Sequence, residues 1–136
     1  MKIIQIAGLA NSGKTSFIRN LIPVLKSYGS VGVIKHLGEH EYRQEEGKDT
    51  TVFFENGADI SAGINSGKSV VALQTIDLDE ILILFKQQGI DFAVIEGFKT
   101  RDFPKIIIGD LLNETCILRN PTADQVVSSL TRFEDY

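Results

Sequence analysis

An α/β fold with a mostly parallel sheet is predicted by three observations. Short apolar runs alternate with segments of helical periodicity along the 136 residues. The run 92–95 is continuously apolar, as expected for a strand that is buried on both faces of a parallel sheet. A glycine-containing loop, 8–15, separates the first apolar run from the first helical segment. A chain of this length suits one compact domain, 1–136.

Hydrophobic spacing and turn residues place the individual elements. In the first helical segment, Phe17, Leu21 and Leu25 recur at helical spacing, and Pro23 predicts a kink or an early end. The turn 65–68 predicts a hairpin, and 37–48 is expected to be a loop. The predicted strands are 2–7, 31–34, 60–64, 70–74, 92–95, 105–108 and 115–118. The predicted helices are 14–27, about 48–57, 77 or 79 to about 88, and 122 to about 130.

Composition and charge narrow the classes of function. The net charge is -4, the hydrophobic content 43% and the charged content 24%, so a basic nucleic-acid-binding surface is not indicated, with a local patch left open. No stretch approaches roughly 18 apolar residues, so a membrane span is not expected. A signal peptide is not apparent, which favours a cytoplasmic protein. The single cysteine, Cys116, stands in an apolar run and is expected to be a small buried side chain.

The loop 8–15 fits G-x-x-x-x-G-K-[ST], the phosphate-binding P-loop. Its glycines let the backbone approach phosphate oxygens, and the amides at the start of the helix attract negative charge. Lys14 is expected to reach the outer phosphates, and the Thr15 hydroxyl is expected to bind Mg²⁺. The alternative is an ordinary glycine turn before a helix. The predicted nucleotide-binding residues here are Gly8, Asn11, Ser12, Gly13, Lys14, Thr15 and Ser16.

Two acidic residues are candidates to complete a magnesium site. Glu96 directly follows the apolar strand 92–95 and is a candidate metal ligand and catalytic residue together with Lys14. Its alternative role is that of a solvated or helix-capping glutamate. Asp49 stands at the start of a predicted helix after the polar loop, where it can complete the metal shell or simply stabilise the first turn.

Three further segments follow predicted strands and carry weaker signals. Lys35 is a candidate phosphate contact, and His36 a candidate contact to the nucleotide or to a second ligand. His36 and His40 have a spacing that binds metal on a helix, but Gly38 argues against a helix, so solvated histidines are the alternative. The segment 98–101 is either an anion contact or a solvated loop. Asn120 offers an amide donor and acceptor for reading a base edge.

Taken together, these blocks are similar to one family. The P-loop at 8–15, Val33-Ile34-Lys35-His36, Gly47-Lys48-Asp49-Thr50, Val94-Ile95-Glu96-Gly97-Phe98-Lys99 and Pro104-Lys105-Ile106 occur in the order and spacing of the molybdopterin-guanine dinucleotide biosynthesis protein B family, MobB. The resemblance covers about residues 1–109 and rests most on the block around Glu96. The sequence departs from the family in the histidines after Lys35 and in the region after 109.

The resemblance implies a P-loop NTPase fold of three layers that binds GTP and Mg²⁺ and hydrolyses GTP slowly. It implies an accessory role beside the guanylyltransferase MobA, a homodimer, and molybdopterin as a further ligand. It matches the family's P-loop to 8–15, its metal-supporting glutamate to Glu96 and its Asp-Thr pair to Asp49 and Thr50. Two other functions stay open, namely an ATP-dependent small-molecule kinase and a non-catalytic module that nucleotide switches.

Overall fold

The computed structural model describes residues 1–38, 48–75 and 77–136. This part of the chain divides into two compact units, residues 1–36 with 81–136, and residues 37–80. The expectation of a single domain, 1–136, stays a prediction. The predicted loop 37–48, including His40, falls largely outside the described residues.

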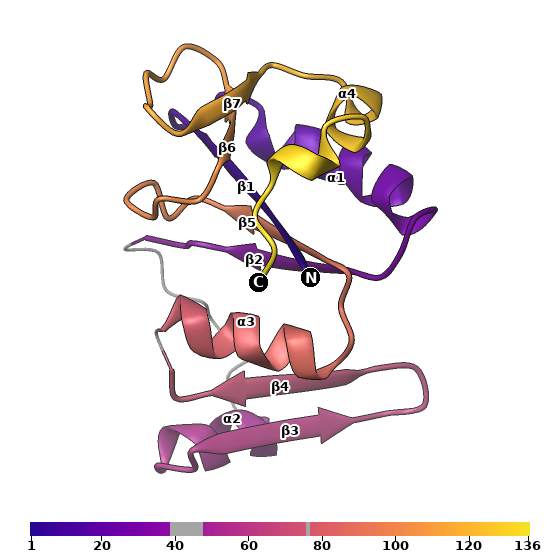
Figure 1. Cartoon of the computed structure of the whole chain (residues 1–136). Helices are drawn as coiled ribbons and strands as arrows, with labels where there is room; N and C mark the ends of the chain where they lie inside the picture. The colour runs from indigo at the N-terminus through magenta and orange to yellow at the C-terminus, as the bar shows by residue number, and fades with distance from the viewer. Residues whose placement is uncertain (39–47, 76) are drawn as a thin grey trace. The chain divides into compact units, whose positions relative to one another are not determined.

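A five-stranded parallel sheet forms the first unit (Figure 1). The spatial order is β2-β5-β1-β6-β7, so the first strand in sequence occupies the centre of the sheet. Every strand predicted for this unit is present, which confirms the predicted parallel sheet. The strands are β1 (Lys2–Gly8), β2 (Val31–Lys35), β5 (Phe92–Glu96), β6 (Lys105–Ile108) and β7 (Cys116–Arg119).

Helices α1 (Lys14–Lys26) and α4 (Ala123–Val127) pack against each other beside the sheet (Figure 1). Pro23 lies within α1 without ending it, because the helix continues to Lys26. Thr122 caps α4 through a capping box with Gln125, as its sequence position predicted. The helix expected to reach about Leu130 ends at Val127 and gives way to the 3-10 turn η1 (Leu130–Arg132).

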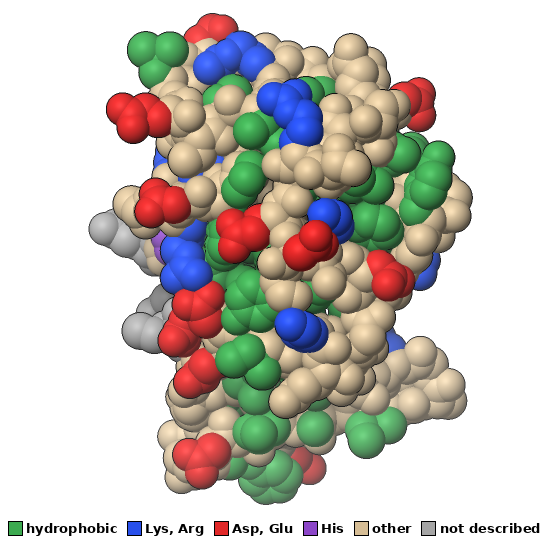
Figure 2. Space-filling model, viewed as in Figure 1, with side chains coloured by type: hydrophobic (Ala, Val, Ile, Leu, Met, Phe, Trp, Pro, Cys, Tyr) green, Lys and Arg blue, Asp and Glu red, His purple; other side chains and the backbone are tan. Residues whose placement is uncertain are grey.

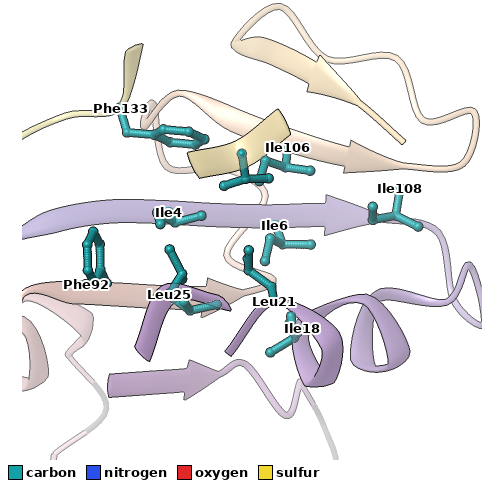
Figure 3. Close-up of a cluster of buried hydrophobic side chains, with 11 residues drawn as sticks. Ile4, Ile6, Ile18, Leu21, Leu25, Phe92, Ile106, Ile108 and Phe133 are labelled. Carbon is teal, nitrogen blue, oxygen red and sulfur yellow. The ribbon is translucent and has the colours of Figure 1, made fainter. Parts of the chain in front are cut away.

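The hydrophobic core lies between the sheet and these helices (Figure 3). Isoleucines from β1 and β6 meet the periodic face of α1, and Phe133 closes the cluster from the C-terminal tail. The buried members are Ile4, Ile6, Ile18, Leu21, Leu25, Phe92, Val94, Ile106, Ile108, Val126 and Phe133. This packing fixes β1 and α1 rigidly on either side of the loop that joins them.

Helix α3 (Leu78–Gln87) spans the boundary between the two units. Leu82 is fully buried, whereas Ile81 and Phe85 are only half-buried. Phe85 packs directly on Gly32 of β2, where a Cβ atom would come within 2.3 Å of the Phe85 ring. A glycine is therefore required at this point of β2 for α3 to approach the sheet.

The second unit contains α2 (Asp49–Glu55) and the antiparallel hairpin of β3 (Ile60–Ile64) and β4 (Ser69–Leu73). The predicted hairpin is thereby confirmed. Its turn is held by Asn65, whose Oδ1 accepts hydrogen bonds from the amides of Gly67 and Lys68 at 2.8 and 2.9 Å. Hydrophobic side chains gather on the visible surface over the hairpin (Figure 2). Ile60, Ile64, Val70 and Val71 of the hairpin strands are exposed.

Two expectations about single features have plain outcomes. Cys116 is half-buried at the start of β7 rather than buried, because the strand lies at the edge of the sheet. Among the described helices, none is long and apolar enough to span a membrane.

Candidate functional site

The P-loop runs from the carboxyl end of β1 to the amino end of α1, with the backbone packed too closely for a side chain at its first position. A Cβ atom on Gly8 would lie 2.4 Å from the Ile108 carbonyl oxygen and 2.6 Å from Ser12 Oγ. Asn11 and Gly13 adopt positive φ values of 58° and 92°. The loop is therefore wrapped tightly, and its shape depends on the glycines that the motif predicted.

The amino end of α1 is open toward an anion. Its N-cap residue is Gly13, which makes no side-chain capping bond, so the first amides of the helix keep their capacity to donate. Those amides and the helix dipole favour negative charge at this point. Ser12 Oγ is buried and has no hydrogen-bond partner within the described residues, which leaves a hydroxyl for a ligand inside the loop.

Lys14 folds back over the loop that it belongs to. Its Nζ donates to the carbonyl oxygens of Leu9 at 2.6 Å and Gly8 at 3.4 Å. The ammonium is thus held against the backbone of the P-loop by two neutral acceptors. A phosphate oxygen offers Lys14 a stronger, charge-assisted partner in the same place.

Glu96 is brought directly to the P-loop. It is the last residue of β5 rather than the residue after the strand, and its carboxylate accepts from Thr15 Oγ1 at 3.3 and 3.5 Å. Lys35 Nζ, at the end of β2, lies 3.6 Å from Glu96 Oε1. The parallel pairing of β1, β5 and β2 places these three side chains at one edge of the sheet.

The hydroxyl of Thr15 and the carboxylate of Glu96 are both hard oxygen donors, which is the donor type that Mg²⁺ prefers. Within the described residues, no group of three or more His, Cys, Asp or Glu side chains is arranged to hold a metal. A site with few protein ligands suits Mg²⁺, because this ion commonly keeps water and takes phosphate oxygens as its other ligands. The two donors therefore fit Mg²⁺ bound together with a nucleotide.

The turn after Glu96 contains two consecutive residues at positive φ, Gly97 at 97° and Phe98 at 49°. Gln5 Nε2 donates to the carbonyl oxygens of both, at 2.7 and 2.6 Å. The Phe98 ring stacks on His36 with centroids 4.5 Å apart, and the His36 amide donates to the Glu96 carbonyl oxygen at 2.8 Å. The turn thus connects the ends of β1, β2 and β5.

Lys105 holds the far end of the same loop. It is 1% exposed, and its Nζ donates to the carbonyl oxygens of Arg101 and Phe103 and to Thr115 Oγ1. Burial lowers the pKa of Lys105 from its ordinary value of 10.5, while the nearby Asp102 opposes that shift. Sequence reasoning missed Gln5 and Lys105; the available signal was a polar residue within an otherwise apolar strand.

Asn120 has a structural contact that the sequence did not reveal. It stands at φ 46° after β7, and its Oδ1 accepts the Gly109 amide at 2.7 Å. Arg119 donates to the carbonyl oxygens of Gly109 and Leu111 at 2.7 and 3.0 Å. These bonds tie together the loops after β6 and β7. Base reading by Asn120 stays a prediction, with the amide NH₂ as the group that remains for it.

Three further candidates, Asp49, Ser16 and Lys99, are located on their own elements. Asp49 is the first residue of α2 in the second unit, where its charge favours the start of that helix. Its role as a metal ligand stays a prediction. Ser16 lies in the first turn of α1, and Lys99 is exposed in the loop after Glu96. The predicted metal pair of His36 and His40 includes a residue, His40, that lies outside the described residues.

A parallel sheet with a P-loop after its central strand, and with an acidic residue at the end of the neighbouring strand, defines a P-loop NTPase fold. A crystal structure of Bacillus subtilis MobB matches with a TM-score of 0.72 at 24% identity, covering 100% of both chains. A MobB homolog from Bacillus stearothermophilus matches with a TM-score of 0.59 at 22% identity, covering 100% of this chain and 74% of that one. At these identities the likeness shows the fold.

The sequence comparison then gives the family. The family model "Molybdopterin guanine dinucleotide synthesis protein B" matches residues 3–128, and the chain belongs to this MobB family. It is 36% identical over 110 residues to a probable molybdopterin-guanine dinucleotide biosynthesis adapter protein of Bacillus subtilis, covering 78% of this chain and 64% of that protein. A putative adapter protein of Methanocaldococcus jannaschii is 33% identical over 112 residues, covering 79% and 47%. The chain spans between about half and two thirds of the length of these relatives.

Proposed function

We propose that this chain is a GTP-binding accessory protein of molybdopterin-guanine dinucleotide biosynthesis that uses Mg²⁺ and hydrolyses GTP slowly. The observation that carries the proposal is the contact of Thr15 Oγ1 with the Glu96 carboxylate at 3.3 Å, beside an open helix start. This arrangement places an anion-binding helix start beside oxygen ligands suited to Mg²⁺, at the carboxyl ends of the strands. Membership of the MobB family supports the choice of pathway and of guanine nucleotide.

Each residue of the site has a defined task in this proposal. The amides at the start of α1 and the Lys14 ammonium bind and neutralise the phosphates. Thr15 and Glu96 hold Mg²⁺, which when bound offsets charge on the phosphate oxygens. Lys35, now paired with Glu96 at 3.6 Å, is free to turn to a phosphate oxygen once a cation occupies that carboxylate.

Slow turnover follows from the way the site is built. The loop 8–15 contains no arginine, and an arginine placed on the transferring phosphate contributes about 10³–10⁵-fold to hydrolysis in related chemistry. Glu96 is then left to orient water without an arginine on the transferring phosphate. We therefore expect hydrolysis to serve handover of nucleotide or cofactor rather than bulk turnover.

The wider role is also part of the proposal. Relatives carry the name of adapter proteins, which supports a biosynthetic partner, and we propose that this partner is a MobA-like guanylyltransferase. We further propose a cytoplasmic homodimer, with molybdopterin as a ligand of the complex. The chain spans only part of its relatives' length, so these proposals rest on the described site and on family membership alone.

Calorimetric titration of the purified chain with GTP and with ATP, each with Mg²⁺ and with EDTA, tests the proposal. Mg²⁺-dependent binding that prefers GTP by about tenfold, or about 1.4 kcal/mol, is expected. A preference for ATP of the same size would refute the assignment and favour a small-molecule kinase. Binding that is indifferent to Mg²⁺ would refute the metal role of Thr15 and Glu96.

A further inference from the structure

Gln5 is a buried polar residue in the central strand of the sheet. It is fully buried and lies in register with Ile95 of β5 and Lys105 of β6. Its Nε2 donates to the carbonyl oxygens of Gly97 and Phe98, while its Oε1 has no hydrogen-bond partner within the described residues. Gln5 therefore makes contact with the loop that follows Glu96, although 91 positions separate it from that residue.

The orientation of the Gln5 amide is fixed by those two carbonyls. Only the nitrogen can donate to them, since the oxygen would face two other acceptors. Its oxygen is consequently left in the protein interior without a donor, which costs free energy. An apolar side chain in this strand would avoid that cost, so the local packing of β1 does not by itself explain a glutamine here.

The two residues whose carbonyl oxygens accept from Gln5, Gly97 and Phe98, both have positive φ values. Gly97 adopts φ 97° and Phe98 adopts φ 49°, a value that is unfavourable for a bulky residue. Such a conformation persists only where surrounding contacts maintain it. Both hydrogens of the Gln5 amide are directed at this pair of carbonyls, so the side chain opposes relaxation of the turn.

This turn is continuous with the metal-binding side of the site. The Gly97 amide donates to the Ile6 carbonyl oxygen at 3.0 Å, and a Cβ atom on Gly97 would lie 2.8 Å from His36 Cβ. The Phe98 ring stacks on His36, whose own amide bonds the Glu96 carbonyl. A change in the turn therefore moves the backbone that carries the Glu96 carboxylate.

We propose that Gln5 is a positioning residue for Mg²⁺ in the nucleotide site. It maintains the turn 97–98 and thereby keeps the Glu96 carboxylate 3.3 Å from the Thr15 hydroxyl. The proposal rests on the function proposed above, because it assigns Mg²⁺ to these two donors. Lys105 holds the far end of the loop through the carbonyls of Arg101 and Phe103, so Gln5 governs the end nearest the metal.

The test compares Gln5→Met with Ile3→Ala as a matched control. Methionine is similar to glutamine in length and removes both donors, whereas Ile3→Ala perturbs the same strand at a fully buried position. The quantity measured is the ratio of GTP affinity in Mg²⁺ to that in EDTA, which reports coupling between metal and nucleotide. We expect Q5M to lower this ratio by about tenfold and to leave affinity in EDTA unchanged. A ratio equal to that of the I3A control would overturn the proposal.

A second variant tests whether backbone strain at Phe98 is the link. Glycine adopts positive φ without strain, so the F98G background removes the backbone strain against which Gln5 maintains the turn. We expect Q5M to reduce the Mg²⁺ ratio by about threefold or less in the F98G background, because the two changes act on one turn. An undiminished tenfold effect in that background would contradict strain as the link.

Amide hydrogen exchange separates failure of this inference from failure of the proposed function. The Gly97 amide, bonded to Ile6, and the Arg101 amide, bonded to Phe98, report the turn without any ligand. We expect exchange at both to be about tenfold faster in Q5M than in I3A, relative to core amides of the same variant. A wild-type chain that fails to bind GTP would refute the proposed function, whereas equal exchange at these amides would overturn the positioning role of Gln5.

Discussion

The parallel sheet of the first unit has an amino edge, where its strands begin, and a carboxyl edge, where they end. The polar groups at these two edges are arranged differently. At the amino edge, Asp91 accepts from the Ser30 amide and hydroxyl at 2.7 and 2.9 Å, and Lys2 pairs with Asp135 at 2.8 Å. The C-terminal tail adds backbone bonds to the start of β1, including Ile3 to Glu134 at 3.0 Å. The polar groups named here are all paired.

The carboxyl edge contains residues with unfavourable backbone conformations and, among the groups that the structure describes, a hydroxyl without a hydrogen-bond partner. In the described part of the chain, the non-glycine residues at positive φ are Asn11, Phe98 and Asn120, and each follows the end of a strand. Ser12 Oγ lies in the P-loop at the same edge without a partner among the described residues. Paired polar groups therefore mark the amino edge, while backbone strain and this hydroxyl mark the edge where we propose that nucleotide binds.

Lys14→Ala, at the carboxyl edge, should cause the largest loss of GTP affinity. Loss of the ammonium leaves phosphate charge uncompensated, and we expect GTP binding to weaken by about 2 kcal/mol or more, roughly thirtyfold in Kd. Lys26→Ala, in the last turn of the same helix, is the control and should leave GTP affinity unchanged. Calorimetry measures both; equal effects of the two variants would contradict a localised phosphate site.

Gly8→Ala should damage the carboxyl edge sterically. The added methyl meets the Ile108 carbonyl oxygen at 2.4 Å, so the loop or β6 must shift, and we expect a loss of about 1–3 kcal/mol of unfolding free energy together with weaker GTP binding. Gly67→Ala is the control, because its nearest neighbour would be Asn65 Oδ1 at an ordinary 3.7 Å. Urea titration compares the variants, and a Gly8→Ala chain as stable as wild type would show that the loop is not tightly packed.

Glu96→Gln should weaken the Mg²⁺-dependent part of GTP binding and leave phosphate binding intact. The amide keeps the shape of the side chain but lacks its charge, so we expect Mg²⁺-dependent GTP affinity to fall by about tenfold while binding in EDTA is retained. Glu134→Gln, exposed in the C-terminal tail, is the matched control. Calorimetric titrations with and without Mg²⁺ test this prediction. An unchanged Mg²⁺ dependence of GTP affinity would show that Glu96 is not a metal ligand.

Asp91→Asn should have the smallest effect and should act on stability alone. Hydrogen bonds from the Ser30 amide and hydroxyl lower the pKa of Asp91 below its ordinary value of 3.8. The stabilisation is therefore full above pH 3.8 and is lost as the pH falls through the folded pKa. We expect the variant to be less stable than wild type at about pH 7, with the difference shrinking in acid, and to bind GTP normally. Urea titrations across this range would contradict the account if the difference grew on acidification.

The parts of this fold that depend on local pattern could be predicted from the sequence. The P-loop is a contiguous motif between a strand and a helix, and Thr122 is recognisable as a cap because its partner is three residues away. The end of α4 was placed three residues too late, since the switch to a 3-10 turn depends on how the tail packs.

The supporting residues could not be predicted, because their partners are distant in sequence. Gln5 contacts residues 92 and 93 positions away, and nothing near Gln5 in the chain indicates those carbonyls. Lys105 looks like a surface charge in the sequence but is buried among carbonyl oxygens. Glu96 was predictable as a candidate because strand ends converge in parallel sheets, whereas its pairing with Lys35 required the strand order.

The most direct test of the central claim is an NMR titration of the isotope-labelled chain with GTP and Mg²⁺. We expect backbone amide signals of 8–15 and 96–99 to shift, while those of Ser30, Asp91 and 134–136 at the amino edge stay in place. Shifts confined to the amino edge, or no shift at either edge, would contradict the assignment of the carboxyl edge as the nucleotide site.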